Sequence, residues 1–371
     1  MRRMRRYIYQ LTNWPDFTWN QEDIISLLGR ARYTQGVLLG KMEGLGILLQ
    51  KEAMLETLTL DVLKSSEIEG ALLHPDQVRS SIARHLGMDI SGLVPSDRFV
   101  DGVVEMMVDA IMQYDKPLSA ERLFSWHSAL FPTGRSGMYK IVAGDWRKDE
   151  TGPMQVVSGA LGKEKIHFQA PDAALLDKEM NAFLDWFNTE NQVDPVIKAG
   201  IAHLWFVIIH PFEDGNGRIA RAIADMQLTR ADGNKQRFYS MSAQIRIERN
   251  AYYNILEKTQ NGNLDITGWL QWFLNCLMNA LRATDKTLAR VLLKAKFWEN
   301  HAAISLNKRQ IIMINKLLDE FEGKLTSSKW AKISKCSSDT ALRDINDLIA
   351  KEILQKLKSG GRSAAYELRI D

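Results

Sequence analysis

One apolar segment that is stopped by a proline constrains the fold of this chain more than any other feature. Residues 196–209 are almost wholly apolar, and their length predicts a helix that is buried on all sides. Pro211 cannot continue this helix, and it biases His210 away from the α region. His210 is therefore predicted to lie where a buried helix ends and a loop begins.

The loop after His210 leads into a second helix, predicted over residues 217–231 and ended by Asp232-Gly233. Glycines in the loop let backbone N–H groups approach a ligand closely, and the N-terminus of a helix attracts anions. Arg218 and Arg221 lie three residues apart on the new helix, so they share a face and add positive charge. The segment therefore predicts an anion site.

Two further side chains in this segment are candidates for metal binding and for proton transfer. Asp214 offers a hard oxygen ligand suited to Mg²⁺, which takes one or two carboxylates together with phosphate oxygens. His210 can accept a proton near neutral pH. The combination indicates phosphoryl or nucleotidyl transfer.

Gly215, Gly217 and Ala220 also fit a dinucleotide fingerprint. That fingerprint needs a preceding strand, and the upstream segment is predicted to be helical, so the dinucleotide interpretation is rejected.

Residues 210–221 resemble the signature of the Fic family, His-Pro-Phe-x-Asp/Glu-Gly-Asn-Gly-Arg-x-x-Arg, and match every fixed position of it. The resemblance extends over about residues 123–274 and implies transfer of AMP from ATP to a hydroxyl side chain of a target protein. In that scheme His210 deprotonates a Ser, Thr or Tyr of the target, and Asp214 holds Mg²⁺. The remaining signature residues contact the nucleotide phosphates: Gly215, Asn216, Gly217, Arg218 and Arg221.

A second resemblance lies upstream, where apolar residues at three- and four-residue spacing lead to Ser65 and Glu69 on one helix face. Residues 65–70 resemble the inhibitory motif Ser/Thr-x-x-x-Glu-Gly/Asn of Fic proteins that carry an N-terminal inhibitory helix. The resemblance implies that Glu69 pairs with Arg221 and occupies the space of the ATP γ-phosphate. An arginine fork can bind a carboxylate or a phosphate, and not both. An ordinary helix end capped by Gly70 is the alternative.

Two strand candidates, 154–157 and 165–168, flank a glycine-containing turn and predict a β-hairpin. By resemblance this hairpin is the flap that binds the target segment by strand addition, and a purely structural hairpin is the alternative. The flap residues implied are Val156, Val157, Ser158 and Gly159.

A helix after the signature carries Tyr252, Tyr253 and Gln260, and it resembles the stretch of Fic domains around the adenine and ribose. Aromatic faces suit a nucleobase. Aromatic residues at helical spacing are equally typical of a hydrophobic core, so both interpretations stay open for these three residues.

Composition predicts two or three domains of an ordinary globular protein, since 45% of the 371 residues are hydrophobic and 25% are charged. The two cysteines, Cys276 and Cys336, favour a reducing compartment over a disulfide scaffold or a metal site. The basic start is not followed by an apolar segment, so no signal peptide is expected. No apolar run approaches the about twenty residues of a membrane span. These features predict a cytoplasmic protein without a membrane partner.

The C-terminal part is basic, with 17 Lys+Arg against 11 Asp+Glu from Asp285 onward. Three predicted helices (308–321, 326–333 and 337–354) and two strands around Gly360-Gly361 resemble a winged helix-turn-helix. Thr340 and Arg343 on the third helix would then face a groove of DNA. Such domains also serve as dimerisation or protein-docking modules, so DNA docking and protein docking both stay open.

The sequence thus predicts a mostly α fold in three parts: an N-terminal helical region with an inhibitory helix (1–115), a Fic core with a β-hairpin flap (116–282) and a winged helix-turn-helix-like domain (283–371). The expected function is transfer of AMP from ATP, with Mg²⁺, to a Ser, Thr or Tyr hydroxyl of a target protein, restrained by Glu69. Two alternatives remain: removal of AMP from a modified protein, and a DNA-binding regulator whose Fic core senses nucleotide. A homodimer is a further open point.

Overall fold

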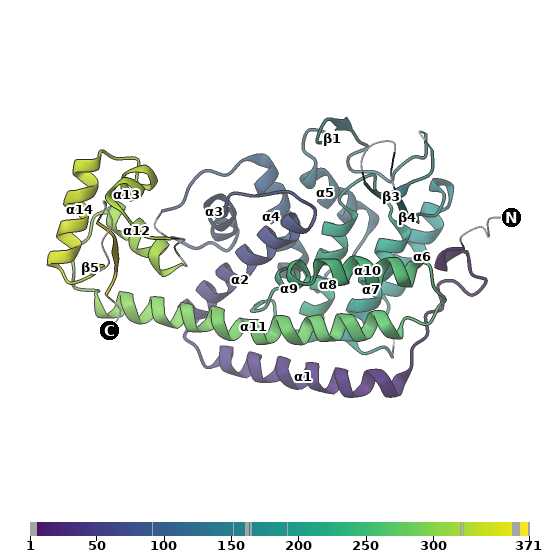
Figure 1. The fold of residues 1–371 in the computed structure, drawn as a ribbon. Coiled ribbons are helices and arrows are strands. Elements are labelled where there is room, and N and C mark those ends of the chain that lie inside the picture. Colours follow the sequence, from purple (N-terminus) through teal and green to yellow (C-terminus); the bar gives the residue numbers. More distant parts are fainter. Residues whose placement is uncertain are drawn as a thin grey trace. The chain divides into compact units, whose positions relative to one another are not determined.

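The computed structural model describes residues 6–90, 92–150, 152–159, 163, 165–190, 192–319, 321, 323–357 and 364–369. The chain divides into two compact units, residues 1–87 with 95–284 and residues 88–94 with 285–371. The fold is mostly helical, as predicted (Figure 1). The N-terminal region and the Fic core, which were predicted as separate domains, lie together in the first unit.

The first unit opens with the short turn η1 (Ile8–Gln10) and two long helices, α1 (Gln21–Glu43) and α2 (Ile47–Ile68). Asn20 caps α1, because its side-chain oxygen accepts hydrogen bonds from the backbone N–H groups of the first turn. Gly70, with φ of +83°, ends α2 in the left-handed conformation typical of helix ends. Two shorter helices follow: α3 (Pro75–His85) and α4 (Arg98–Met112).

The centre of the first unit is the predicted buried helix, α7 (Pro195–Ile209), in which every residue after Pro195 is buried. The long helix α8 (Asn216–Asp232) packs along α7 and ends at Gly233, as the sequence predicts. Two other helices pack beside this pair: α5 (Ala120–Leu130) on α8, and α6 (Leu176–Asn188) on α7. A short turn, η2 (Ala173–Leu175), precedes α6.

The helices after α8 differ from the prediction in one place. The chain continues through α9 (Met241–Ile247), α10 (Arg249–Gln260) and α11 (Thr267–Asn300). A break was expected between residues 274 and 281, but α11 is one continuous helix of 34 residues. No glycine or proline lies between residues 269 and 300, so nothing in the backbone forces the helix to stop.

The described residues form three strand pairs, and all three are antiparallel. The predicted flap is the hairpin of β3 (Gln155–Ser158) and β4 (Lys165–Gln169), with a register shift between Val156 and Val157. A second hairpin, β1 (Arg135–Ser136) with β2 (Tyr139–Lys140), lies where only a loop was predicted, because strands of two residues show no periodicity.

The second unit has its own hydrophobic core around the fully buried Trp330. Its elements match the predicted order: α12 (Lys308–Leu318), α13 (Ser327–Ile333), α14 (Ser338–Ala350), β5 (Leu354–Lys356) and β6 (Tyr366–Leu368). The predicted glycine turn at 360–361 lies outside the described residues. Arg343 is exposed on α14, and Thr340 is half-buried.

Within the described ranges, no helix combines the length and the apolarity needed to cross a membrane.

Candidate nucleotide site in the first unit

The last turn of α7 places His210 in the left-handed conformation, with φ of +52°. A non-glycine residue in this region is held there by its surroundings. Here the buried Arg147 holds it: its backbone N–H donates to the Pro211 carbonyl at 2.9 Å and its Nε to the His210 carbonyl at 2.8 Å. No local pattern in the sequence indicated this role of Arg147, because the contact joins residues that lie 63 positions apart.

The His210 ring is arranged to act as a proton acceptor. Its Nδ1 lies 3.3 Å from the Val207 carbonyl, which fixes the proton on Nδ1 and leaves Nε2 with a lone pair. Burial lowers the pKa of His210 to about 4, so the ring is neutral at neutral pH. His210 lines a cavity of about 550 Å³, a volume within the usual range for small-molecule sites.

The N-terminus of α8 forms the floor of this cavity. Gly215 precedes the helix with φ of +83° and provides no side-chain cap, so the first backbone N–H groups of α8 remain available. A Cβ atom at Gly217 would collide with Oε1 of Glu69, so the Glu69 carboxylate lies directly against the first turn of α8. A carboxylate from α2 thus already occupies a site that favours anions.

Arg221 holds this carboxylate. Its Nη1 lies 2.8 Å from Glu69 Oε1, while its Nε and Nη2 donate to the side chain and the carbonyl of Ser65, both at 2.9 Å. Only 1% of the arginine is exposed. Ser65 and Glu69, four residues apart at the end of α2, therefore make three contacts with one guanidinium.

Arg218 is buried one turn earlier on α8, and burial lowers its pKa. Its guanidinium lies 5.0 Å from the centre of the Phe131 ring and 3.8 Å from the Asp214 carboxylate. Its Nε is buried and has no hydrogen-bond partner among the described residues. A buried donor of this kind fits an incoming anion.

The signature loop is braced by contacts that the sequence did not predict. The Asn216 side chain bonds both the N–H and the carbonyl of Phe212, at 3.0 and 2.7 Å, so it can meet a phosphate only through its backbone. His127 stacks on Phe212, accepts from the N–H of Gly144 at 3.0 Å and donates to the Asp214 carbonyl at 3.1 Å. These contacts fix the loop before any ligand is bound.

The Asp214 side chain is 43% exposed at the cavity rim and accepts a hydrogen bond from Ser136 of the unpredicted β1–β2 hairpin. No group of three or more His, Cys, Asp or Glu in the described part of the chain could hold a metal ion. A single rim carboxylate still fits Mg²⁺ in nucleotide sites, because phosphate oxygens and water supply the other ligands.

The cavity brings together most of the predicted site residues. Those that line it are Glu69, Val156, Val157, Ser158, His210, Asp214, Gly215, Asn216, Gly217, Tyr252, Tyr253 and Gln260. Ser65, Gly159, Arg218 and Arg221 are not part of the lining. Tyr252 is buried, and its hydroxyl bonds His203 at 2.8 Å, so this tyrosine also belongs to the core.

The β3–β4 hairpin is joined to α10 by residues that the sequence analysis did not single out. His167 of β4 lies 2.7 Å from the Glu257 carboxylate, and Ser158 of β3 lies 2.6 Å from the other ring nitrogen of His167. All three residues line the cavity. This chain of contacts holds the hairpin over the site.

Three histidines with lowered pKa values predict how the stability of the protein depends on pH. Burial lowers the pKa of His127 and His210 to about 4 and that of His203 to about 3. Between about pH 6.5 and 4 the unfolded chain binds these protons and the folded chain does not, so the free energy of unfolding should fall on acidification. Each histidine contributes about 1.4 kcal/mol per pH unit in that window.

Urea unfolding at pH 7 and pH 5, followed by tryptophan fluorescence, measures this effect. His127→Asn should reduce the loss of stability between the two pH values, whereas the same change at the exposed His74 should leave it unaltered. An unchanged pH dependence in the His127 variant would contradict the assignment of a neutral, buried ring.

Comparison with known proteins identifies two regions of the chain. Residues 117–228 match the Fic/DOC family, and residues 7–88 match a domain of unknown function, DUF4172. The chain is 29% identical to "Protein adenylyltransferase fic-1" of Caenorhabditis elegans over 183 residues, which are 49% of this chain and 34% of that protein. It is 33% identical to "Protein adenylyltransferase Fic" of Nematostella vectensis over 110 residues, 29% of this chain and 24% of that one. The match thus spans about a third or less of these relatives.

Solved structures show the same fold. A Fic family protein from Desulfovibrio desulfuricans G20 covers 96% of this chain and 98% of its own, with a TM-score of 0.54 at 20% identity. A Fic domain containing signaling protein from Bacteroides thetaiotaomicron covers 72% of this chain and 97% of its own, with a TM-score of 0.51 at 21% identity. Residues 117–228 of this chain thus form a Fic/DOC domain, the named adenylyltransferases are similar to the chain over part of their length, and the solved Fic proteins share its fold.

Proposed function

We propose that this protein transfers AMP from ATP to a hydroxyl side chain of a target protein. One observation carries the proposal: a neutral histidine with its Nε2 lone pair lies in the same cavity as a helix N-terminus that already accommodates a carboxylate. The site therefore offers a general base beside a preformed anion site. The relatives named as protein adenylyltransferases agree with this chemistry.

The reaction follows from these positions. His210 Nε2 takes the proton of the target hydroxyl, whose oxygen forms a bond to the α-phosphorus of ATP. The bond from that phosphorus to the bridging oxygen breaks, and pyrophosphate leaves. The first turn of α8 and Arg218 bind the phosphates, and Asp214 is the residue that would hold Mg²⁺. When bound, Mg²⁺ offsets the negative charge of the phosphates.

The target hydroxyl must enter in an extended segment beside the flap. The flap hairpin lines the cavity, and Val157 is exposed on β3. Addition of the segment to this hairpin would supply main-chain hydrogen bonds without requiring one particular target sequence. Ser, Thr and Tyr all present the hydroxyl that the chemistry requires.

Restraint by Glu69 belongs to the same proposal. Its carboxylate pairs with Arg221 and lies against the first turn of α8, so the outer phosphates of ATP and this carboxylate compete for one space. A bound ATP would either displace Glu69 or adopt an unproductive position. The wild-type protein is therefore expected to transfer AMP slowly.

Labelled ATP provides the direct test. When the purified Glu69→Gly protein is incubated alone with Mg²⁺ and ATP labelled at the α-phosphate, we expect label in the protein itself. The same ATP labelled at the γ-phosphate should leave the proteins unlabelled, because that phosphate departs in pyrophosphate. Mass spectrometry should find AMP on Ser, Thr or Tyr, and equal labelling from both ATPs would contradict the proposal.

Removal of AMP is a second candidate, because the Glu69 carboxylate lines the same cavity as His210 and could orient water. Incubation of an AMP-modified protein without ATP, with wild type and with Glu69→Gly, separates the two directions: hydrolysis requires Glu69, whereas transfer does not. Docking of DNA or protein by the second unit, a homodimer and a cytoplasmic location remain predictions from the sequence.

A further inference from the structure

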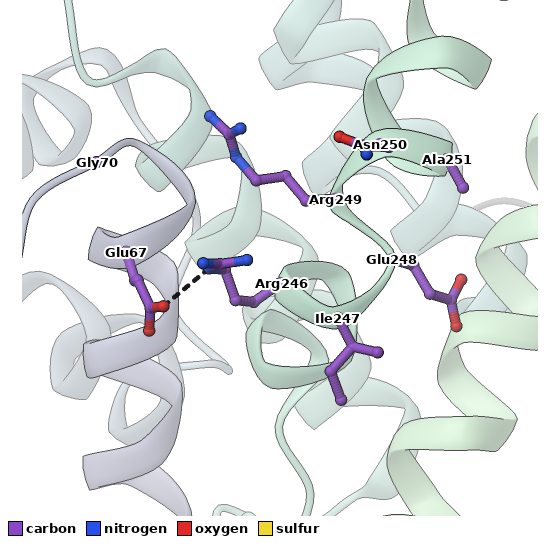
Figure 2. A pocket seen from close by; sticks show the side chains of 8 residues that line it. All are labelled: Glu67, Gly70, Arg246, Ile247, Glu248, Arg249, Asn250 and Ala251. Carbon is purple, nitrogen blue, oxygen red and sulfur yellow. Dashed lines mark hydrogen bonds and ion pairs between the residues drawn. The ribbon is translucent and has the colours of Figure 1, made fainter.

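A second cavity lies in the first unit, outside the nucleotide site. It measures about 580 Å³ and lies between the end of α2 and the junction of α9 with α10 (Figure 2). Glu67 and Gly70 line it from α2, and Arg246 and Arg249 line it from the junction. The proposed function makes no use of this cavity, although it borders the helix that carries Glu69.

The two arginines hold the last turn of α2, and each does so through Nε. Arg246 Nε donates to the Glu67 carboxylate at 3.0 Å, and Arg249 Nε donates to the Ile68 carbonyl at 2.9 Å. Among the described residues, no hydrogen bond engages the Nη atoms of Arg246, whereas the guanidinium of Arg249 also interacts with the Tyr253 side chain. Figure 2 shows both side chains directed toward the end of α2, whereas Glu248 points the opposite way. The Nη donors of Arg246, together with those Arg249 donors that do not meet Tyr253, therefore remain for a ligand.

The charge around the cavity favours an anion. Glu67 is shared by Arg246 and Lys64, whose Nζ lies 2.6 Å away, and this hydrogen bond from Lys64 is the main reason that the pKa of Glu67 is lowered. Glu248, the other carboxylate of the lining, accepts hydrogen bonds from Gln244 and Asn279. The lining itself holds two arginines and two carboxylates, and Lys64, which bonds Glu67 from outside the lining, makes the local charge positive.

We propose that this cavity binds a small polyanion with at least two carboxylate or phosphate groups, and that its binding releases Glu69. A planar carboxylate or a phosphate matches the fork of each arginine. The volume suits a ligand of metabolite size rather than a single ion. The binding part of this proposal stands alone, and the release of Glu69 rests on the proposed function.

Two contacts connect the cavity to the nucleotide site. The first is covalent: Glu69 directly follows Ile68, so an anion that draws Arg249 from the Ile68 carbonyl and Arg246 from Glu67 loosens the turn that positions Glu69. The second is Arg249 itself, which lines both cavities and lies 5.0 Å from the ring centre of Tyr253. ATP binding needs the displacement of Glu69. By thermodynamic linkage, an anion that binds more tightly when Glu69 is displaced must therefore raise the affinity for ATP.

Binding is tested by calorimetry with citrate and with inorganic phosphate, against chloride at matched ionic strength. The Arg246→Gln/Arg249→Gln protein should bind citrate at least about tenfold more weakly than wild type, because two charge-assisted contacts are lost. A matched control, Arg30→Gln/Arg98→Gln, removes two exposed arginines elsewhere and should bind as wild type does. Tighter binding of citrate than of phosphate would identify a carboxylate ligand, and the reverse a phosphate ligand. Equal affinity of wild type and the Arg246/Arg249 variant would overturn the proposal.

The coupling between anion binding in this cavity and release of Glu69 is tested by self-labelling with ATP at constant free Mg²⁺. The better-binding anion should raise the rate of wild type severalfold and leave the rate of Glu69→Gly unchanged, because that variant has no restraint to release. Stimulation of both proteins, or of neither, would overturn the coupling. An absence of labelling in Glu69→Gly would instead refute the proposed AMP transfer, and the calorimetric result would still decide whether the cavity binds anions.

Discussion

Transfer of AMP is expected to fall by about 10²- to 10⁴-fold when His210 is replaced by alanine, the usual loss for a general base. The neutral ring lines the cavity, and alanine offers no proton acceptor there. The rate of labelling from ATP labelled at the α-phosphate measures the effect. The comparison is best made in the Glu69→Gly background, where the starting rate is higher.

The His210→Ala protein should still bind ATP, because the first turn of α8 and its two arginines are unchanged. Equal ATP affinity together with a lost rate would assign His210 to the chemical step. A variant that keeps most of its transfer rate would contradict the role of His210 as base. Loss of ATP binding as well would indicate that alanine disturbs the turn held by Arg147, and His210→Asn would then replace it as the test variant.

The Glu69→Gly substitution is expected to act in the opposite direction and to raise self-labelling by about 10- to 100-fold, the worth of one charge-assisted arginine contact. Removal of the carboxylate frees Arg221 and clears the space against Gly217. Glu69 is the C-cap of α2 and precedes a left-handed glycine, so a glycine at this position should do little harm to the helix. The gain should therefore reflect the site and not a change in folding.

Two further variants make this test specific. Glu69→Gln keeps the size of the side chain and removes its charge, so it should give a smaller gain than glycine does. Glu43→Gly removes an exposed carboxylate from the end of α1 and should leave the rate as it is in wild type. A folded Glu69→Gly protein that labels itself no faster than wild type would refute restraint by Glu69.

The sequence alone was sufficient to place α7, the loop and α8, because each of these elements follows from local signals. A continuous apolar run predicts a buried helix, Pro211 ends it, and Asp232-Gly233 ends the next one. The hairpin β3–β4 was predicted for the same reason, since alternation and turn residues lie within a few positions of one another. The continuity of α11 was missed, although no glycine or proline interrupts residues 269–300. The sequence therefore contained no signal for the break that was expected between residues 274 and 281.

The sequence by itself determined which groups are available: a histidine at a helix end, a carboxylate, an uncapped helix start with two arginines, and a glutamate on an upstream helix. Only the tertiary structure decided how they meet. Arg147, His127 and Ser136 brace the signature loop from segments far away in the chain, and no local pattern reports such contacts. The close approach of Glu69 to Gly217 likewise depends on how α2 packs in the first unit, because hydrogen bonds and charges act over a few ångströms in space, whatever the separation along the chain.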